Sequence, residues 1–192
     1  KTANLMVAEG KGILAADEST PTCDNRFNSI GITTSINKRN EYRDMLFTTE
    51  NLKDFVSGII LFDETIQQST IIDRIPFPTY LKSKGIIPGI KVDMGTKLLA
   101  FSKSELITEG LDGLRERLQK YYNMGARFAK WRAVLKIGNG IPTESCYQAN
   151  AHSLARYASL CQESGLVPIV EPEVLMDGTH TIEECYDVTV HI

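Results

Sequence analysis

Acidic and basic side chains follow five successive short apolar runs of this chain. The ionisable residues at these positions are Asp17, Glu18, Asp63, Glu64, Lys91, Asp93, Lys130, Arg132, Glu171 and Glu173. Three of the five groups are spaced by two residues, and side chains with that spacing point to the same side of a strand. Carboxylates among cations can stay ionised near neutral pH and transfer protons, and ammonium groups attract phosphate and developing negative charge. The pattern therefore predicts acid–base chemistry at a site that also attracts anionic groups.

The apolar runs predict β-strands, and the longer amphipathic stretches between them predict helices. The expected strands cover residues 12–16, 58–62, 86–92, 126–131 and 167–170, and the expected helices cover residues 38–47, 110–124 and 145–163. One face of the third helix is marked by apolar residues three and four positions apart, at Ala151, Leu154, Ala155, Ala158 and Cys161. Residues 2–7 are expected to end a helix, and the last residues to lie in another. Strands that alternate with helices indicate right-handed βαβ units and a parallel sheet.

Two α/β architectures fit this alternation, an open doubly wound sheet and a (β/α)8 TIM barrel. No GxGxxG motif follows the first strand, which argues against a dinucleotide-binding sheet. Charges at the carboxyl ends of successive strands are typical of the catalytic mouth of a (β/α)8 barrel. We therefore expect a TIM barrel of which about five βα units are present. Residues 1–192 would form a single incomplete barrel domain that lacks strands six to eight.

The composition argues against several classes of partner. The 192 residues carry 21 basic and 24 acidic side chains, a formal charge of −3, so we expect neither nucleic acid nor a membrane as a partner. No run approaches the roughly 20 apolar residues that a membrane span needs. The four cysteines include no CxxC pair and are expected to be reduced thiols of a cytoplasmic protein. The three histidines are too scattered to form a metal site, and no cofactor is expected.

Six segments of the chain carry a family resemblance in matching order and spacing. They are KGILAADEST (residues 11–20), GIKVDMG (89–95), EGLDGLRER (109–117), FAKWR (128–132), LARYASLCQ (154–162) and VPIVEPE (167–173). Through them the chain resembles the N-terminal portion of class I (Schiff-base) fructose-1,6-bisphosphate aldolases over essentially its whole length. The resemblance implies a glycolytic and gluconeogenic lyase that reversibly cleaves fructose 1,6-bisphosphate to dihydroxyacetone phosphate and glyceraldehyde 3-phosphate. It also implies a cytoplasmic homo-oligomer, a tetramer.

The same resemblance implies which residues are catalytic. Asp17 matches the aspartate that accepts a proton from the substrate hydroxyl, and Glu171 matches the general acid and base of carbinolamine dehydration. Lys130 matches a lysine that lines the cavity, and Glu173 is a supporting candidate two residues after Glu171. The lysine that forms the Schiff base belongs to a segment after strand six that this sequence does not contain. The 192 residues alone are therefore expected to be inactive.

A second set of residues is expected to bind the phosphate groups of the sugar bisphosphate. These candidates are Ser19, Thr22, Arg26, Arg39, Lys91 and Arg132. Hydroxyl and N–H groups at the start of a helix suit a phosphate, and arginine adds charge-assisted hydrogen bonds. Thr22 stands where a serine is common in the family and keeps the hydroxyl. Asn25 and Met94 stand where lysine is frequent, so two positive charges are missing.

Other functions fit a part of the same pattern. Transaldolase and deoxyribose-phosphate aldolase are also Schiff-base barrels, but neither family carries these motifs. A different possibility is a non-catalytic truncated barrel fragment that acts as a phosphate-binding or scaffolding module. A Schiff-base lysine after strand six would favour the enzyme over the module.

Overall fold

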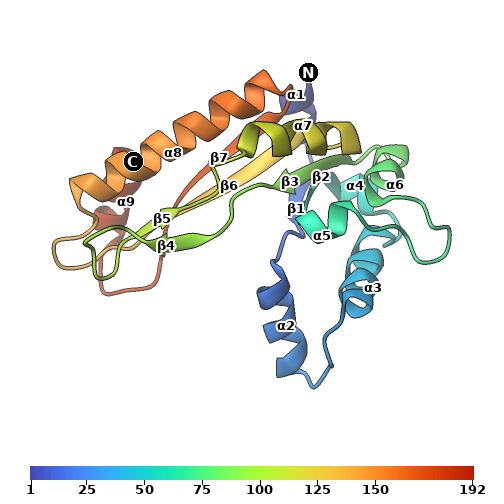
Figure 1. Ribbon diagram of the computed structural model, residues 1–192, viewed down its shortest axis with the longest axis horizontal. Helices are drawn as coiled ribbons and strands as arrows, with labels where there is room; N and C mark the ends of the chain where they lie inside the picture. Colours follow the sequence, from blue (N-terminus) through green and yellow to red (C-terminus); the bar gives the residue numbers. More distant parts are fainter. The chain divides into compact units, whose positions relative to one another are not determined.

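The computed structural model describes residues 1–192 (Figure 1). Its helices are α1 Thr2–Met6, α2 Thr20–Ser29, α3 Ile36–Phe47, α4 Leu52–Phe55, α5 Asp63–Ile66, α6 Phe77–Ser83, α7 Leu114–Met124, α8 Glu144–Glu163 and α9 Ile182–His191. Its strands are β1 Gly12–Ala15, β2 Val56–Leu61, β3 Ile87–Lys91, β4 Thr96–Leu98, β5 Leu106–Thr108, β6 Phe128–Leu135 and β7 Val167–Val174. No helix is both long and apolar enough to span a lipid bilayer.

The five predicted strands are confirmed as β1, β2, β3, β6 and β7, which form one sheet in that order. β1 pairs with β2 and β2 pairs with β3 in parallel. The three predicted helices are confirmed as α3, α7 and α8, and helices also stand at both ends of the chain as expected. The sequence pattern missed the antiparallel pair β4–β5, because strands of three residues are too short to show a period. The helix start expected at Ser19 and Thr22 is confirmed as α2, whereas the short helices α4, α5 and α6 were not predicted.

The chain divides into two compact units, which we describe separately. Unit 1 comprises Lys1–Lys91 and Lys120–Ala129, and unit 2 comprises Val92–Gln119 and Lys130–Ile192. Unit 1 holds β1, β2, β3 and helices α1 to α6. Unit 2 holds the β4–β5 pair, β7, α8, α9 and most of β6.

The core of unit 1 depends on two glycines that make room for an aromatic ring. The ring of Phe128 is fully buried against β2 and β3. A Cβ atom built on Gly89 would lie 2.2 Å from Cζ of Phe128, and one on Gly58 would lie 3.0 Å from Cε1. Glycine in a strand often marks such a close approach. The glycines of the two apolar runs are therefore packing positions.

The first prediction concerns Gly89. We expect Gly89→Ala to lower the free energy of unfolding by about 1–3 kcal/mol, because the new methyl group would overpack the buried Phe128 ring. Gly12→Ala in β1 is the matched control, since a Cβ there would meet no atom within 4 Å. Urea unfolding followed by circular dichroism measures the free energy of unfolding of both variants. Equal losses for the two variants would show that the Phe128 contact does not limit the size of residue 89.

Unit 2 is built around the packing of α8 on the strands beside it (Figure 1). The rings of Trp131 and Tyr157 lie 5.5 Å apart, and the Tyr157 hydroxyl donates to the carbonyl of Ile169 at 3.1 Å. The buried face of α8 differs from the predicted one, because Ala155 is exposed. That face is formed by Cys146, Asn150, Ser153, Leu154, Tyr157 and Cys161. Periodicity missed its two polar members, whose side chains donate to backbone carbonyl groups.

The β4–β5 pair is anchored to the start of α8. Glu105 is 6% exposed, and its carboxylate accepts hydrogen bonds from the backbone N–H of Thr143 at 2.6 Å and from the Thr143 hydroxyl at 3.0 Å. The Asn150 amide donates to the carbonyl of Leu106 at 3.0 Å. A carboxylate at a helix N-terminus satisfies N–H groups that have no partner within the helix. Residues at the start of β5 thus fix the β4–β5 pair to α8.

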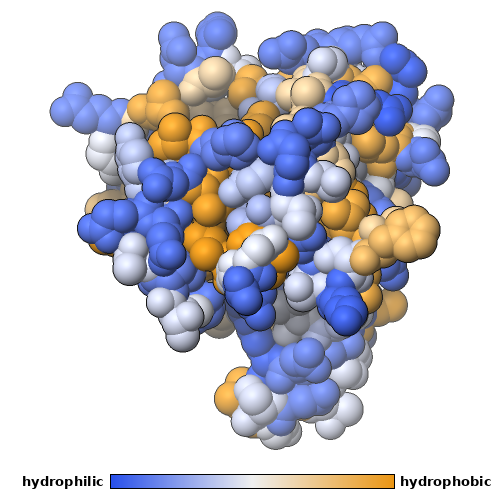
Figure 2. Space-filling view, turned by 90° about the vertical axis from the view of Figure 1, so that its left-hand side faces the viewer, coloured by the Kyte–Doolittle hydropathy of each residue, from blue (hydrophilic) through white to orange (hydrophobic).

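Part of the surface of unit 2 is apolar. The exposed apolar residues of α9 are four positions apart and form one stripe, Ile182, Tyr186 and Val190. β7 is only half-buried along most of its length, whereas β6 is largely buried. Figure 2 shows the side of the molecule that carries α9, with apolar side chains in several patches among hydrophilic ones. This surface leaves room for further packing against β7 and α9.

Candidate active site

In unit 1, the segment after β1 places a carboxylate among three donors. The carboxylate of Glu18 accepts hydrogen bonds from the guanidinium groups of Arg26 and Arg43 and, at 3.1 Å, from the Tyr42 hydroxyl. Arg43 also donates to the backbone carbonyl of Glu18 at 2.8 Å, and its side chain is only 2% exposed. These contacts tie the end of β1 to α2 and α3. The neighbouring Asp17 is buried at 7% exposure.

The surroundings of Glu18 keep this carboxyl group ionised. Burial alone raises its pKa, but the hydrogen bond and charge of Arg43, with a smaller contribution from Tyr42, outweigh burial and bring the pKa below its ordinary value of 4.5. An ionised Glu18 in turn compensates the buried guanidinium of Arg43. The pair is therefore a structural support for the segment that carries Asp17.

Four of the predicted phosphate ligands of unit 1 lie on α2, on its N-cap or on α3. The hydroxyls of Ser19 and Thr22 lie 3.0 Å apart at the start of α2, where Ser19 is the N-cap residue. Arg26 has an exposed side chain and pairs with Glu18. Arg39 is buried, and its guanidinium contacts Glu64 at 2.8 Å and Asp24 at 3.0 Å. Its role toward phosphate stays a prediction, and the observed contacts hold α3 to α2 and α5.

A second prediction tests this carboxylate. Glu18→Gln should lower the free energy of unfolding at pH 7 by about 3 kcal/mol, because it leaves the buried Arg43 without a counter-charge. Since folding depresses the pKa of Glu18, its contribution is complete above the unfolded pKa and is lost as pH falls through the folded pKa. Urea unfolding at pH 7 and at about pH 3 should show the difference between wild type and variant shrinking with acid.

The control for Glu18 is an exposed ion pair of the same type. Lys38 and Glu41 lie 2.6 Å apart on the surface of α3, with both side chains about half exposed. Glu41→Gln should change the free energy of unfolding by less than about 1 kcal/mol. A Glu18→Gln effect no larger than this, or one independent of pH, would show that the buried pair does not stabilise the fold.

In unit 2, the neighbouring strands β6 and β7 place two cations opposite two carboxylates. These residues were expected at strand ends, but they lie within the strands, because β6 continues to Leu135 and β7 to Val174. Nζ of Lys130 on β6 lies 3.4 Å from Oε2 of Glu171 on β7, and Nε of Arg132 donates to Oε2 of Glu173. Both cations and both carboxylates are spaced by two residues, so each pair of strand positions points to one side. The Lys130 and Glu171 side chains are 13% and 31% exposed, less than those of Arg132 and Glu173 at 41% and 36%. The predicted grouping of these four residues is thus present in the structure.

The two carboxyl groups differ in their affinity for a proton. Burial raises the pKa of Glu171 above 4.5, and the nearby Lys130 offsets only a part of this. The hydrogen bond from Arg132 lowers the pKa of Glu173 below 4.5 and outweighs its burial. Carboxyl groups whose pKa values are pushed apart are typical of acid–base sites, in which one transfers protons and the other stays charged. Glu171 is the group suited to proton transfer.

Three residues that were not predicted to be catalytic or phosphate-binding also have defined contacts in the structure. Asp93 is buried at 9% exposure, and its carboxylate accepts from the backbone N–H of Gly95 at 3.1 Å. Glu18 and Arg43 form the buried pair described above. Asp93 and Glu18 each follow a strand, and that signal was available in the sequence. Arg43 carried no signal, because an arginine within an amphipathic helix is usually exposed.

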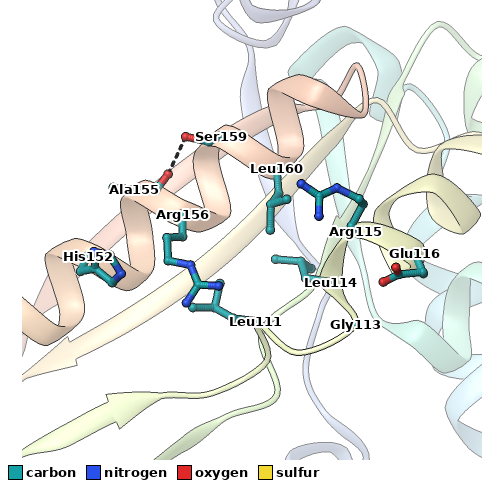
Figure 3. Close-up of a pocket in the computed structure, with 10 residues that line it drawn as sticks. All are labelled: Leu111, Gly113, Leu114, Arg115, Glu116, His152, Ala155, Arg156, Ser159 and Leu160. Carbon is teal, nitrogen blue, oxygen red and sulfur yellow. Dashed lines mark hydrogen bonds between the residues drawn. The ribbon is translucent and has the colours of Figure 1, made fainter.

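A hollow in unit 2 is lined by none of these residues. It has a volume of about 590 Å³ and opens between the start of α7 and the middle of α8 (Figure 3). Arg115 and Arg156 point into it over an apolar floor that includes Leu114 and Leu160 (Figure 3). None of the predicted catalytic or phosphate-binding residues lines it. In the whole chain no three His, Cys, Asp or Glu side chains gather as metal ligands.

Comparison of the sequence with known proteins matches it to one family of enzymes. The family model "Fructose-bisphosphate aldolase class-I" matches residues 1–192. A "Probable fructose-bisphosphate aldolase class 1" of Xanthomonas campestris pv. campestris is 61% identical over 189 residues, which are 98% of this chain and 56% of the relative. "Fructose-bisphosphate aldolase 4, cytosolic" of Arabidopsis thaliana is 55% identical over 183 residues, which are 95% of this chain and 46% of the relative. The chain thus spans about half the length of these relatives.

A solved structure extends the match to three dimensions. Fructose-bisphosphate aldolase from Plasmodium falciparum, in a ternary co-crystal with TRAP and a small-molecule inhibitor, superposes with a TM-score of 0.94 at 52% sequence identity. The match covers 98% of this chain and 55% of that one. The predicted fold class is therefore confirmed for the strands that the chain contains: the five-stranded sheet is part of a (β/α)8 barrel.

Proposed function

The chain belongs to the class I fructose-bisphosphate aldolase family, and on that premise we propose that it supplies the acid–base part of a Schiff-base aldolase. The complete enzyme would reversibly cleave fructose 1,6-bisphosphate to dihydroxyacetone phosphate and glyceraldehyde 3-phosphate. The observation that carries the proposal is the pairing of Lys130 with Glu171 beside Arg132 with Glu173. It provides a proton-transfer group and a charged pair on adjacent strands.

Glu171 is proposed as the general acid and base of the site. Its raised pKa keeps a larger protonated fraction near neutral pH than an ordinary carboxyl group has, so it can both give and accept a proton. Dehydration of a carbinolamine needs an acid for the leaving water, and hydrolysis of the imine needs a base for the entering water. Lys130, at 3.4 Å, stabilises the carboxylate that remains after Glu171 gives up its proton and that later accepts a proton from the entering water. Glu173 stays ionised against Arg132 and serves in support.

Asp17 is proposed to accept the proton whose removal begins cleavage of the carbon–carbon bond. It follows the end of β1, and the Glu18–Arg43 pair holds this segment. An ionised carboxylate is required for that step. The iminium that accepts the electrons of the broken bond would form on a lysine outside these 192 residues.

The phosphate groups of the substrate are proposed to bind to hydroxyls and cations. Ser19 and Thr22 combine two adjacent hydroxyls with the N-terminus of α2, which has ten residues. Lys91 at the end of β3 and Arg132 within β6 would add positive charge. Arg26 is exposed and available to a ligand from solvent, whereas Arg39 would act mainly by holding α3 in place.

The remaining features of the complete enzyme follow from family membership. We propose further barrel strands that pair beyond β7, because β7 is half-exposed and α9 presents an apolar stripe. A homotetramer and a cytoplasmic location are also proposed, the latter in line with the plant relatives named cytosolic. Residues 1–192 without the rest of the barrel would be inactive, since they lack the Schiff-base lysine.

The proposed reaction is tested with the full-length enzyme that contains this chain. It should cleave fructose 1,6-bisphosphate with unchanged rate in EDTA, because the chemistry uses an iminium. Borohydride added with dihydroxyacetone phosphate should trap a covalent adduct, which mass spectrometry would find on one lysine. Loss of activity in EDTA with recovery on adding zinc, or the absence of an adduct, would refute a Schiff-base mechanism.

The role of Glu171 predicts a specific kinetic defect. Glu171→Gln should lower kcat by about 100-fold or more while KM changes little, because it removes proton transfer and keeps the side-chain shape. The rate of borohydride trapping should fall in parallel. Glu41→Gln on the surface of α3 is the control and should leave both values unchanged. A defect confined to KM would assign Glu171 to substrate binding.

The role of Arg132 predicts a change in substrate preference. Arg132→Ala should raise KM for fructose 1,6-bisphosphate by roughly 10- to 100-fold, the range expected for a lost charge-assisted hydrogen bond. KM for fructose 1-phosphate, which lacks the second phosphate, should rise less than about threefold. Arg115→Ala is the control, since Arg115 lines the α7–α8 hollow and its side chain pairs with the exposed Glu163. Equal losses on both substrates would assign Arg132 to the chemical step.

A further inference from the structure

The backbone of Arg132 departs from regular strand pairing. The N–H of Val92, just after β3, donates to the carbonyl of Lys130 at 3.0 Å. If parallel pairing continued, Arg132 N–H would donate to the Val92 carbonyl, and Met94 N–H would donate to the Arg132 carbonyl. Instead the Val92 carbonyl accepts from the guanidinium of Arg117 at 2.8 Å, and Met94 N–H donates to Glu109 at 2.9 Å. The chain after β3 thus turns toward β5 and away from β6 at the level of Arg132.

Two side chains take over the backbone hydrogen bonds of Arg132. The hydroxyl of Thr108 donates to the Arg132 carbonyl at 2.7 Å. The carboxylate of Asp93 accepts from the Arg132 N–H at the longer distance of 3.4 Å. Thr108 is 3% exposed, so its hydroxyl bond is protected from water. A buried carbonyl without a hydrogen bond costs free energy, which makes the Thr108 hydroxyl more than an incidental contact.

Thr108 is itself held firmly. It is the last residue of β5 and pairs with Thr96 of β4. At the other end of β5 the preceding Glu105 carboxylate holds the first residues of α8 through Thr143. The hydroxyl of Thr108 therefore acts from a short strand pair that is fixed to α8, and it fixes the main chain at the residue whose guanidinium meets Glu173.

We propose that Thr108 is a positioning residue for substrate recognition by Arg132. Its hydroxyl fixes the position of the Arg132 backbone within β6. That position sets the direction from which the Arg132 guanidinium reaches both Glu173 and the second phosphate of the substrate. The proposal rests on the phosphate role proposed for Arg132. Valine has the same shape as threonine without the hydroxyl, and serine has the hydroxyl without the methyl group, so the two variants separate hydrogen bonding from packing.

The test is a mutant cycle in the full-length enzyme. Thr108→Val should raise KM for fructose 1,6-bisphosphate by about threefold to tenfold, the range for loss of one neutral hydrogen bond. The kcat for fructose 1,6-bisphosphate and the KM for fructose 1-phosphate should each change by less than about twofold. Thr108→Ser should have the wild-type KM for fructose 1,6-bisphosphate. In an Arg132→Ala background, Thr108→Val should have almost no further effect on KM, because residues that act through one another are not additive.

A matched control removes the same kind of bond elsewhere. The Thr48 hydroxyl donates to the carbonyl of Asp44 at 2.7 Å at the end of α3, so Thr48→Val should leave both KM values unchanged. If Thr108→Val does not fold, Thr108→Ala takes its place in the cycle. Equal rises in KM for both substrates, an undiminished effect in the Arg132→Ala background, or no rescue by serine would overturn the positioning role. Wild-type enzyme without cleavage activity would refute the proposed function itself, and that measurement comes first.

Discussion

Burying an ionised side chain costs several kcal/mol unless an opposite charge and hydrogen bonds compensate it, and this constraint governs how the buried cations of the protein are paired. Arg43 is almost fully buried and is matched by Glu18. Arg39 is matched by Glu64 and Asp24. In unit 2, Lys130 faces Glu171 and Arg132 faces Glu173. The pairs hold helices and strands in place and, at the same positions, leave charges arranged for chemistry.

The pairs are not equivalent, and the difference follows from exposure and geometry. The Arg132 guanidinium bonds to Glu173 directly and keeps that carboxyl group ionised. Lys130 stands farther from Glu171, at 3.4 Å, and its effect is smaller than the effect of burial on the Glu171 pKa. Two carboxyl groups two residues apart on one strand therefore have opposite shifts in pKa. This division allows one to move protons while the other stays fixed in charge and position.

Polar side chains also replace hydrogen bonds that the sheet cannot supply. Where the chain leaves β3, Thr108 and Asp93 bond to the backbone of Arg132, and Glu105 bonds to the start of α8. In each case the side chain comes from β5 or from the segments directly before β4 and β5. The short β4–β5 region thus connects Arg132 of β6 with the start of α8.

The sequence by itself determined the five strands of the main sheet, the parallel α/β class and the presence of charged residues on or directly after these strands, because apolar periodicity and charge position are local properties of the chain. Motif spacing also indicated the family. Only the tertiary structure decided which cation meets which carboxylate, since Arg43 and Glu18 are 25 residues apart and Arg132 and Glu173 are 41 residues apart. It likewise decided that Asn150 and Ser153, rather than Ala155, lie on the buried face of α8. Hydrogen bonds to carbonyl groups offset the cost of burying these two polar side chains. The shifts in pKa at Glu171 and Glu173 were also decided only by the tertiary structure, because burial and neighbouring charge exist only after the chain has folded.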